Sequence, residues 1–164
     1  MNPPSQSIAN SRASIFKKWL ALDWRDHILL IRALGVLAHA SLLIAFQPFS
    51  SVAKVANSQT CATPIAPEDR ALVVSKIRWA ILVWARRVPW SAVCFQQALA
   101  AHIMLRRRGI NSTLYYGATP NGAQGLAAHV WVRDGEVFVI GGEVAANFSV
   151  LASFPTDDTP IDGS

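Results

Sequence analysis

The chain has 164 residues, of which 52% are hydrophobic and only 15% are charged. Soluble domains carry about 25% charged residues, so this composition supplies a core and excludes disorder over most of the chain. The length suits one domain, and two cysteines are too few for a disulfide scaffold. Because no segment of about 20 to 50 residues repeats, a solenoid is excluded as well.

The formal net charge of +5 is unevenly distributed along the chain. Residues 1–93 contain eleven Lys and Arg against four Asp and Glu, a net +7, whereas residues 94–164 contain four against six, a net −2. An acidic peptide or an anionic membrane surface would be attracted to the first half. We expect no nucleic acid as a partner, because the interleaved aromatic and basic residues of single-strand binders are missing.

Both ends of the chain are polar. Residues 1–11 show no basic start followed by a short apolar run and a small-residue cleavage site, so they do not resemble a secretion signal. We expect loose tails over residues 1–11 and 155–164, and a cytoplasmic protein in which Cys61 and Cys94 are reduced. Cys61 lies in a predicted loop with no partner at metal-ligand spacing, so it is expected to be inert.

The part that follows the first tail is expected to be helical. One helix begins near Ala13, and a second covers about residues 24–46, with Asp23 placed to cap it. A loop rich in Ser, Thr and Pro occupies residues 57–69, and the acids at its end favour the start of a third helix over about 67–87. The third helix carries one apolar face, formed by Ile77, Ala80, Ile81 and Trp84.

The apolar stretch Ile28–Phe46 raises the question of a membrane. Its 19 residues are about the minimum that spans a bilayer. Arg32 and His39 interrupt it, and an arginine near mid-span costs about 2.5–3.5 kcal/mol on insertion scales. We therefore expect a buried helix of the domain and no membrane contact; a surface-attached helix and a true span are the alternatives.

Residues 88–154 follow the helical part, 12–87. Ser91 is a good N-cap for a helix that runs to Arg106–Arg108 and stops at Gly109. This helix is apolar nearly all round, so we expect it at the centre of the fold.

After this helix the hydrophobic period changes to two, which indicates β-strands. Strands are expected over residues 112–118, 127–133, 136–140 and 147–154, with Asp134–Gly135 as a two-residue hairpin turn. The sequence therefore predicts an α+β domain, with helices first and then a small antiparallel sheet packed against one central helix.

Cys94 lies in the first turn of the predicted central helix, three residues after Ser91. Unpaired amides and the positive end of the helix dipole favour a thiolate there. The same amides are placed to donate hydrogen bonds to an oxyanion in acyl chemistry. Cys94 is therefore a candidate nucleophile, and the alternative is a small buried core residue.

His129 lies in the second predicted strand, on the same face as Ala127 and Trp131. A histidine in a strand otherwise made of small and apolar residues is a candidate general base for Cys94. The alternative is a half-buried structural histidine. Trp90 and Trp131 flank this pair in the sequence and are candidates for the wall of a substrate groove or for core packing.

Several motifs follow one another in a specific order. They are Pro89-Trp90-x-x-x-Cys94-x-x-x-Ala98-Leu99, Leu105-Arg-Arg-Arg-Gly-Ile110, a strand ending in Gly117, Ala128-His129-Val130-Trp131-Val132 and Asp134-Gly135. Together they resemble the leader peptidase of lasso-peptide biosynthesis, the transglutaminase-like protease component of the maturation machinery. The resemblance covers residues 88–154, and its order of cysteine before histidine is that of papain-like and transglutaminase-like sites.

This resemblance implies a transglutaminase-like (papain-like) cysteine protease core that removes the leader from a ribosomally made precursor peptide. Cys94 matches the family's nucleophile and His129 its base. No metal or other cofactor is implied. The resemblance also implies two protein partners, a separate leader-binding protein that presents the precursor and an asparagine-synthetase-like cyclase that closes the ring on the freed amine.

The third catalytic residue is where the chain departs from the family pattern. The family has His-Ala-Trp where this chain has His129-Val130-Trp131, and an acid about a dozen residues later, where this chain has apolar residues and two glycines. If Asp134–Gly135 form the turn, His129 lies opposite Ile140 and Asp134 is about 16 Å away along the strand, too far to orient the ring. Glu143 is the nearest remaining acid, and Asn147 is an amide alternative.

Two other functions stay open at this stage. The same Cys94–His129 site would serve a transglutaminase or acyltransferase that uses an amine in place of water. The missing carboxylate favours a catalytically inactive module that binds a peptide or a partner protein. His102 is about 12 Å from Cys94 along the helix axis, so we expect it in the core or at the surface rather than in the site.

Overall fold

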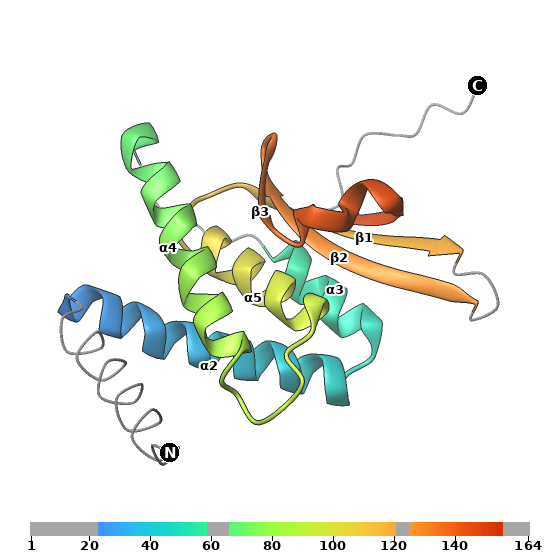
Figure 1. Ribbon diagram of the computed structural model, residues 1–164, viewed down its shortest axis with the longest axis horizontal. Helices are drawn as coiled ribbons and strands as arrows, with labels where there is room; N and C mark the ends of the chain where they lie inside the picture. Colours follow the sequence, from blue (N-terminus) through green and yellow to red (C-terminus); the bar gives the residue numbers. More distant parts are fainter. Residues whose placement is uncertain (1–22, 59–65, 121–124, 156–164) are drawn as a thin grey trace, which may run out of the picture.

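The structure is a computed structural model that describes residues 23–58, 66–120 and 125–155 (Figure 1). The predicted helix near Ala13, Cys61 and nearly all of the two predicted tails lie outside the described residues.

Four α-helices precede the sheet in the described part of the chain: α2 (Trp24–Phe46), α3 (Phe49–Asn57), α4 (Pro67–Ala85) and α5 (Cys94–Arg106). The predicted bounds of α2 are confirmed, and Asp23 occupies its N-cap position, but the Asp23 side chain makes no capping hydrogen bond. The helix α3 is not predicted from the sequence. Its N-cap is Pro48. A proline cannot continue α2, but it is tolerated at the start of the next helix.

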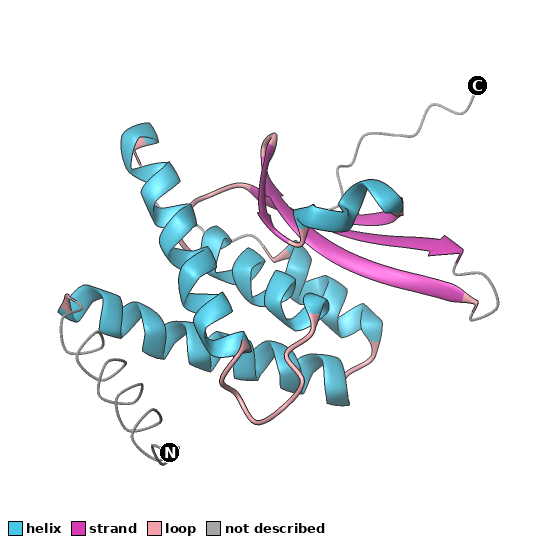
Figure 2. Cartoon of the chain, in the orientation of Figure 1, coloured by secondary structure: helices cyan, strands magenta, loops and turns pink. Residues whose placement is uncertain are grey.

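The chain then forms a four-stranded antiparallel sheet of β1 (Ser112–Pro120), β2 (Leu126–Asp134), β3 (Val137–Ile140) and β4 (Ser149–Phe154), in the order β3-β2-β1-β4. An unpredicted 3-10 helix, η2 (Gly142–Asn147), connects β3 to β4. Figure 2 shows the α-helices gathered on one side of the molecule and the strands on the other. The predicted α+β class, with an antiparallel sheet after the helices, is confirmed.

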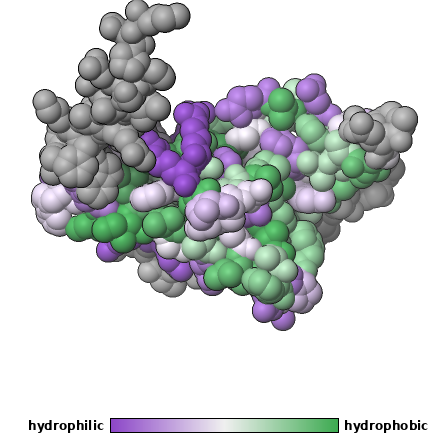
Figure 3. Space-filling model, turned by 60° about the horizontal axis from the view of Figure 1, so that its bottom comes forward, coloured by the Kyte–Doolittle hydropathy of each residue, from purple (hydrophilic) through white to green (hydrophobic). Residues whose placement is uncertain are grey.

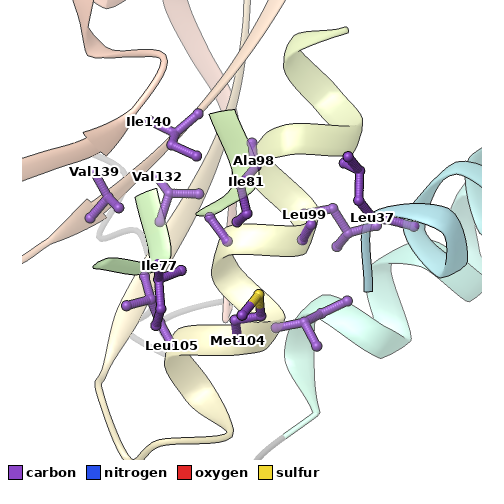
Figure 4. Close-up of a cluster of buried hydrophobic side chains, with 14 of the residues drawn as sticks. Leu37, Ile77, Ile81, Ala98, Leu99, Met104, Leu105, Val132, Val139 and Ile140 are labelled. Atoms are coloured by element: carbon purple, nitrogen blue, oxygen red, sulfur yellow. The ribbon is translucent and has the colours of Figure 1, made fainter. Parts of the chain in front are cut away.

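The helix α5 is the centre of the fold, as predicted. Every residue from Ala98 to Leu105 is buried, because α5 packs against α2 and α4 and also against β1 and β2. Figure 4 shows side chains that meet in this core, namely Leu37, Ile77, Ile81, Ala98, Leu99, Met104, Leu105, Val132, Val139 and Ile140. The start and the end of α5 are about 20 Å apart, so they can serve two different sites.

The helix α2 has the length and composition to cross a membrane, alone among the helices of the described residues. One side of it contributes buried residues to the core, which are Leu29, Leu30, Ala33, Leu37 and Ala40. The other side exposes large apolar residues, which are Trp24, Ile28, Ile31, Leu42 and Phe46. Figure 3 shows hydrophobic and hydrophilic residues side by side on the face that lies at the bottom of Figure 1.

The turn between β2 and β3 differs by one residue from the predicted one. The two turn residues are Gly135 and Glu136, and Asp134 pairs with Val137 inside the sheet. A turn centred on Asp134–Gly135 would need a positive φ at Asp134, whereas the observed turn needs it only at Gly135, where φ is +57°. The Asp134 carboxylate is also held by Arg70 of α4, whose Nε donates to Oδ2 at 2.8 Å.

Candidate active site

Cys94 is the first residue of α5. The N-cap is Val93 rather than the predicted Ser91, and no side chain caps the helix. Gln97 organises this end, since its backbone N–H donates to the Val93 carbonyl at 3.2 Å and its side-chain amide donates to the Ala92 carbonyl at 2.6 Å. The sulfur therefore lies two positions nearer the open end of the helix than predicted, among the unpaired amides of the first turn.

His129 lies in the middle of β2, opposite Gly117 of β1. Its ring stacks on that of Trp131, with centroids 6.0 Å apart, and it contacts the ring of Phe148 at 5.2 Å. Its Nε2 lies 2.8 Å from the backbone carbonyl oxygen of Gly141. Two aromatic rings and one hydrogen bond therefore fix the plane of the imidazole.

Cys94 and His129 line the same cavity, which has a volume of about 210 Å³. The cavity receives side chains from α4, α5 and β2 and the chain that leaves β3, and its lining consists of Arg78, Leu82, Cys94, Gln97, His129, Ile140, Gly141 and Glu143. Both residues are only half-buried, so a ligand in the cavity can reach them. The fold thus brings together the two residues that the sequence analysis selected.

Gly141 reaches His129 because the β2–β3 hairpin is irregular. The register shifts next to Val132, which pairs with Ile140, so Ile140 does not lie opposite His129 as predicted. The chain leaves β3 at Gly141 with φ +76°, in the left-handed region. A Cβ at Gly141 would lie 2.7 Å from the Val130 carbonyl oxygen and 3.2 Å from His129 Nε2, so this position requires glycine.

No carboxylate hydrogen-bonds to His129 within the described ranges. Glu143, the acid predicted to orient the ring, lines the same cavity, but its side chain is 69% exposed and pairs with Arg78 at 3.3 Å. Asn147 is exposed in η2. Asp134 is held by α4 through the ion pair described above, in agreement with the prediction that it does not orient His129. The hydrogen bond that the sequence analysis assigned to an acid is made by a backbone carbonyl.

The two candidate groove tryptophans have different surroundings. Trp131 is only 4% exposed and stacks on Tyr115, with centroids 5.7 Å apart, so its role is packing beneath His129 rather than forming a groove wall. Trp90 donates from Nε1 to Ser41 Oγ at 3.0 Å and lines a separate, largely apolar cavity of about 430 Å³ between α2 and the start of α5. Trp90 is therefore partly exposed and lies outside the Cys94 cavity.

His102 belongs to the core, as predicted. Its Nε2 lies 2.8 Å from the Ala56 carbonyl oxygen, and its Nδ1 lies 3.0 Å from Ser112 Oγ. Burial lowers the pKa of His102 to about 4. The neutral ring thus ties α5 to α3 and β1 and takes no part in the site.

A cavity of about 510 Å³ between α2 and the end of α5 was missed by the sequence analysis. Three guanidinium groups and an imidazole line it, from Arg32, His39, Arg107 and Arg108. Burial and then the nearby charge of Arg32 lower the pKa of Arg108. These arginines have no acidic partner in the part of the chain that the structure describes. Only the packing of α2 on α5 brings Arg32 close to Arg107 and Arg108, so no local sequence pattern predicts the cluster.

A family model described as the Transglutaminase-like superfamily matches residues 33–153. The chain belongs to this superfamily. The match starts inside α2, so it includes helices that precede the motifs of residues 88–154. No curated protein and no solved structure gives a significant match. Within the described residues, no three His, Cys, Asp or Glu side chains gather as a metal site would require.

Proposed function

We propose that this protein is a cysteine peptidase that removes the leader from a ribosomally made lasso-peptide precursor. The observation that carries the proposal is the shared cavity of Cys94 and His129, with the sulfur at the open start of a buried helix. Membership of the Transglutaminase-like superfamily supports thiol-based acyl chemistry. The choice of a leader–core junction as substrate rests on the motif resemblance over residues 88–154.

The reaction proceeds in two steps. Cys94 Sγ attacks the scissile carbonyl carbon while the imidazole of His129 accepts the thiol proton. First-turn amides of α5 stabilise the oxyanion, and the C–N bond breaks as His129 returns the proton to the leaving amine. Water, deprotonated by His129, then hydrolyses the thioester. The products are a leader that ends in a carboxylate and a core peptide with a free amine.

The partners of this reaction follow from the same resemblance. A separate leader-binding protein would present the precursor, and an asparagine-synthetase-like cyclase would use the freed amine to close the ring. Because the precursor is made by ribosomes, we place the reaction in the cytoplasm.

The basic first half of the chain is proposed to meet an acidic leader or its carrier. The first half contributes Arg32 to a cavity that Arg107 and Arg108 of the second half also line, and guanidinium groups bind carboxylates in a bidentate manner. Exposed charge pairs weaken as salt screens them, so leader binding should weaken at high ionic strength. Binding that does not change with salt would remove this part of the proposal.

A second candidate is an acyltransferase with the same Cys94–His129 site. The superfamily match favours it as much as hydrolysis, because both reactions pass through a thioester. The mass of the product separates the two, since hydrolysis adds water and transfer adds the acceptor amine. A third candidate, an inactive binding module, is favoured by the lack of a carboxylate at His129 and would form neither product.

The proposal is tested by incubating the wild-type protein and the Cys94→Ala variant with a candidate lasso-peptide precursor and a candidate leader-binding protein. We expect cleavage at the leader–core junction by the wild type and none by the variant. A thioester trapped on Cys94 would confirm the intermediate. Equal processing by both proteins would contradict the assignment of Cys94.

A further inference from the structure

The contacts of His129 determine which ring nitrogen holds its proton. A neutral imidazole carries one N–H, and a carbonyl oxygen can only accept a hydrogen bond. Because Nε2 lies 2.8 Å from the Gly141 carbonyl oxygen, Nε2 is the protonated nitrogen. The other nitrogen, Nδ1, then keeps its lone pair and is the ring atom left to act as a base in the cavity that His129 shares with Cys94.

We propose that the backbone carbonyl of Gly141 is the positioning group of this site and replaces the carboxylate of a Cys-His-acid triad. It fixes the tautomer and the direction of the His129 ring, which is the orienting role that the third member of a triad performs. The inference rests on the proposed function, because it concerns how His129 works as a base. A neutral carbonyl orients the ring without adding a negative charge beside it.

The surroundings hold this carbonyl in place on both sides. On one side, Val139 and Ile140 of β3 are buried in the core, and on the other, Ala145 of η2 is buried. A Cβ on the next residue, Gly142, would lie 2.5 Å from the Phe138 side chain, so the backbone passes close to β3 without room to spare. The carbonyl is therefore part of the rigid fold rather than of a loose loop.

Glu143 and Asp134 are both paired with arginines of α4. Arg78 pairs with Glu143, and Arg70 pairs with Asp134 through two hydrogen bonds. The side chain of His129 also contacts the rings of Trp131 and Phe148. A carboxylate would have to leave an arginine and displace the Gly141 carbonyl before it could orient the imidazole.

Two glycine variants test the inference as a matched pair. Gly141 and Gly135 both have positive φ, at +76° and +57°, so alanine strains the backbone at each. Only at Gly141 would the new Cβ meet His129, because nothing lies within 4 Å of one at Gly135. General bases contribute about 10²–10⁴-fold to a rate. We therefore expect Gly141→Ala to lower kcat for precursor cleavage at least about tenfold with little change in KM, and Gly135→Ala to lower it less than about twofold.

The tautomer of His129 is measured independently of activity, by ¹⁵N NMR of histidine-labelled wild-type protein at neutral pH, with His129→Gln to assign the signal. We expect a protonated Nε2 and an unprotonated Nδ1, and loss of this pattern in Gly141→Ala. An unprotonated Nε2 with the ring proton on Nδ1 in the wild type would overturn the inference, even if Gly141→Ala fails to fold. Equal kcat for the two glycine variants would also overturn it, and so would a larger loss in Glu143→Gln than in Gly141→Ala. If the protein cleaves no precursor but shows the expected tautomer, the proposed function fails while the positioning contact stands.

Discussion

The regions around His102 and His129 use the same backbone contact in different surroundings. In both, the ring Nε2 lies 2.8 Å from a carbonyl oxygen, that of Ala56 in one case and of Gly141 in the other. The second nitrogen of His102 is occupied by Ser112 Oγ, and the residue is only 1% exposed. His129 instead lines a cavity that it shares with Cys94.

The second ring nitrogen distinguishes the histidine of the core from the histidine that lines the cavity. A ring with both nitrogens hydrogen-bonded in the core connects elements and stays neutral. A ring that is held through one nitrogen, with the other open to a cavity, can take up and return a proton. The residue type alone does not distinguish the two, and neither does the carbonyl contact.

The largest expected effect comes from replacing His129. We expect His129→Gln to lower kcat for precursor cleavage by about 10²–10⁴-fold, because the general base is lost. Because His129 is half-buried, we expect His129→Gln to change the free energy of unfolding by no more than about 1 kcal/mol. The control is His102→Gln, which should lower the free energy of unfolding more than His129→Gln does. In the fraction of this variant that remains folded, kcat should fall less than it does in His129→Gln. The opposite order of effects would reverse the roles of the two residues.

The next effect is a loss of stability in acid that comes from His102. Burial lowers its pKa from the ordinary 6.5 to about 4, so between these values the unfolded chain binds a proton that the folded protein does not. Stability from this group is complete above pH 6.5 and falls as the pH decreases toward 4, by roughly 3 kcal/mol.

Urea unfolding at a series of pH values measures this loss. In His102→Gln the same pH interval should show a shallower decline, because glutamine does not titrate. A variant with an unchanged slope would mean that other groups cause the loss.

A smaller effect is expected at Gly117, the residue opposite His129. A Cβ there would lie 2.8 Å from the Trp131 ring and 2.9 Å from the Ser149 carbonyl oxygen, so Gly117→Ala should destabilise the fold by about 1–3 kcal/mol. Gly35→Ala in α2 is the control, because nothing lies within 4 Å of its Cβ. Alanine favours helix over glycine, so this variant should gain up to about 1 kcal/mol. Thermal unfolding measures both, and equal stabilities would show that Trp131 moves aside freely.

The smallest effect lies away from both histidines, at the arginine cavity. We expect the double variant Arg32→Gln, Arg107→Gln to bind an acidic leader peptide a few-fold more weakly at low salt, since exposed charge pairs are worth about 0.2–1 kcal/mol each. The difference should vanish at high salt. The control is Arg86→Gln, which removes a cation outside this cavity. Equal loss in the control would indicate a general effect of net charge.

Much of the fold, and the choice of Cys94 and His129 as candidate site residues, can be predicted from the sequence. Helical periodicity and composition locate α2, α4 and the buried α5, and period-two segments locate the strands, because these signals are local. The chemistry of Cys94 at a helix start and of His129 in an apolar strand selects the two residues that share the cavity. The distant residue His102 is excluded from the site by helix geometry alone.

Other features depend on contacts that no local pattern records. The hairpin turn shifts by one residue because Gly135 alone takes a positive φ and Arg70 holds Asp134. The sequence does not reveal the contact between the Gly141 carbonyl and His129. Every residue has a backbone carbonyl that can accept a hydrogen bond, so no residue type marks the one that does. The only sequence signal for it is the Gly141–Gly142 pair after the third predicted strand.

The central claim, that His129 activates Cys94, is tested most directly by the rate at which iodoacetamide alkylates Cys94 at neutral pH. A Cys61→Ala background leaves one thiol in the chain. A thiol paired with an open imidazole nitrogen reacts faster than an isolated one. We predict that His129→Gln slows alkylation at least about tenfold while His102→Gln leaves the rate within about twofold of the parent. Equal rates in the parent and in His129→Gln would contradict the account.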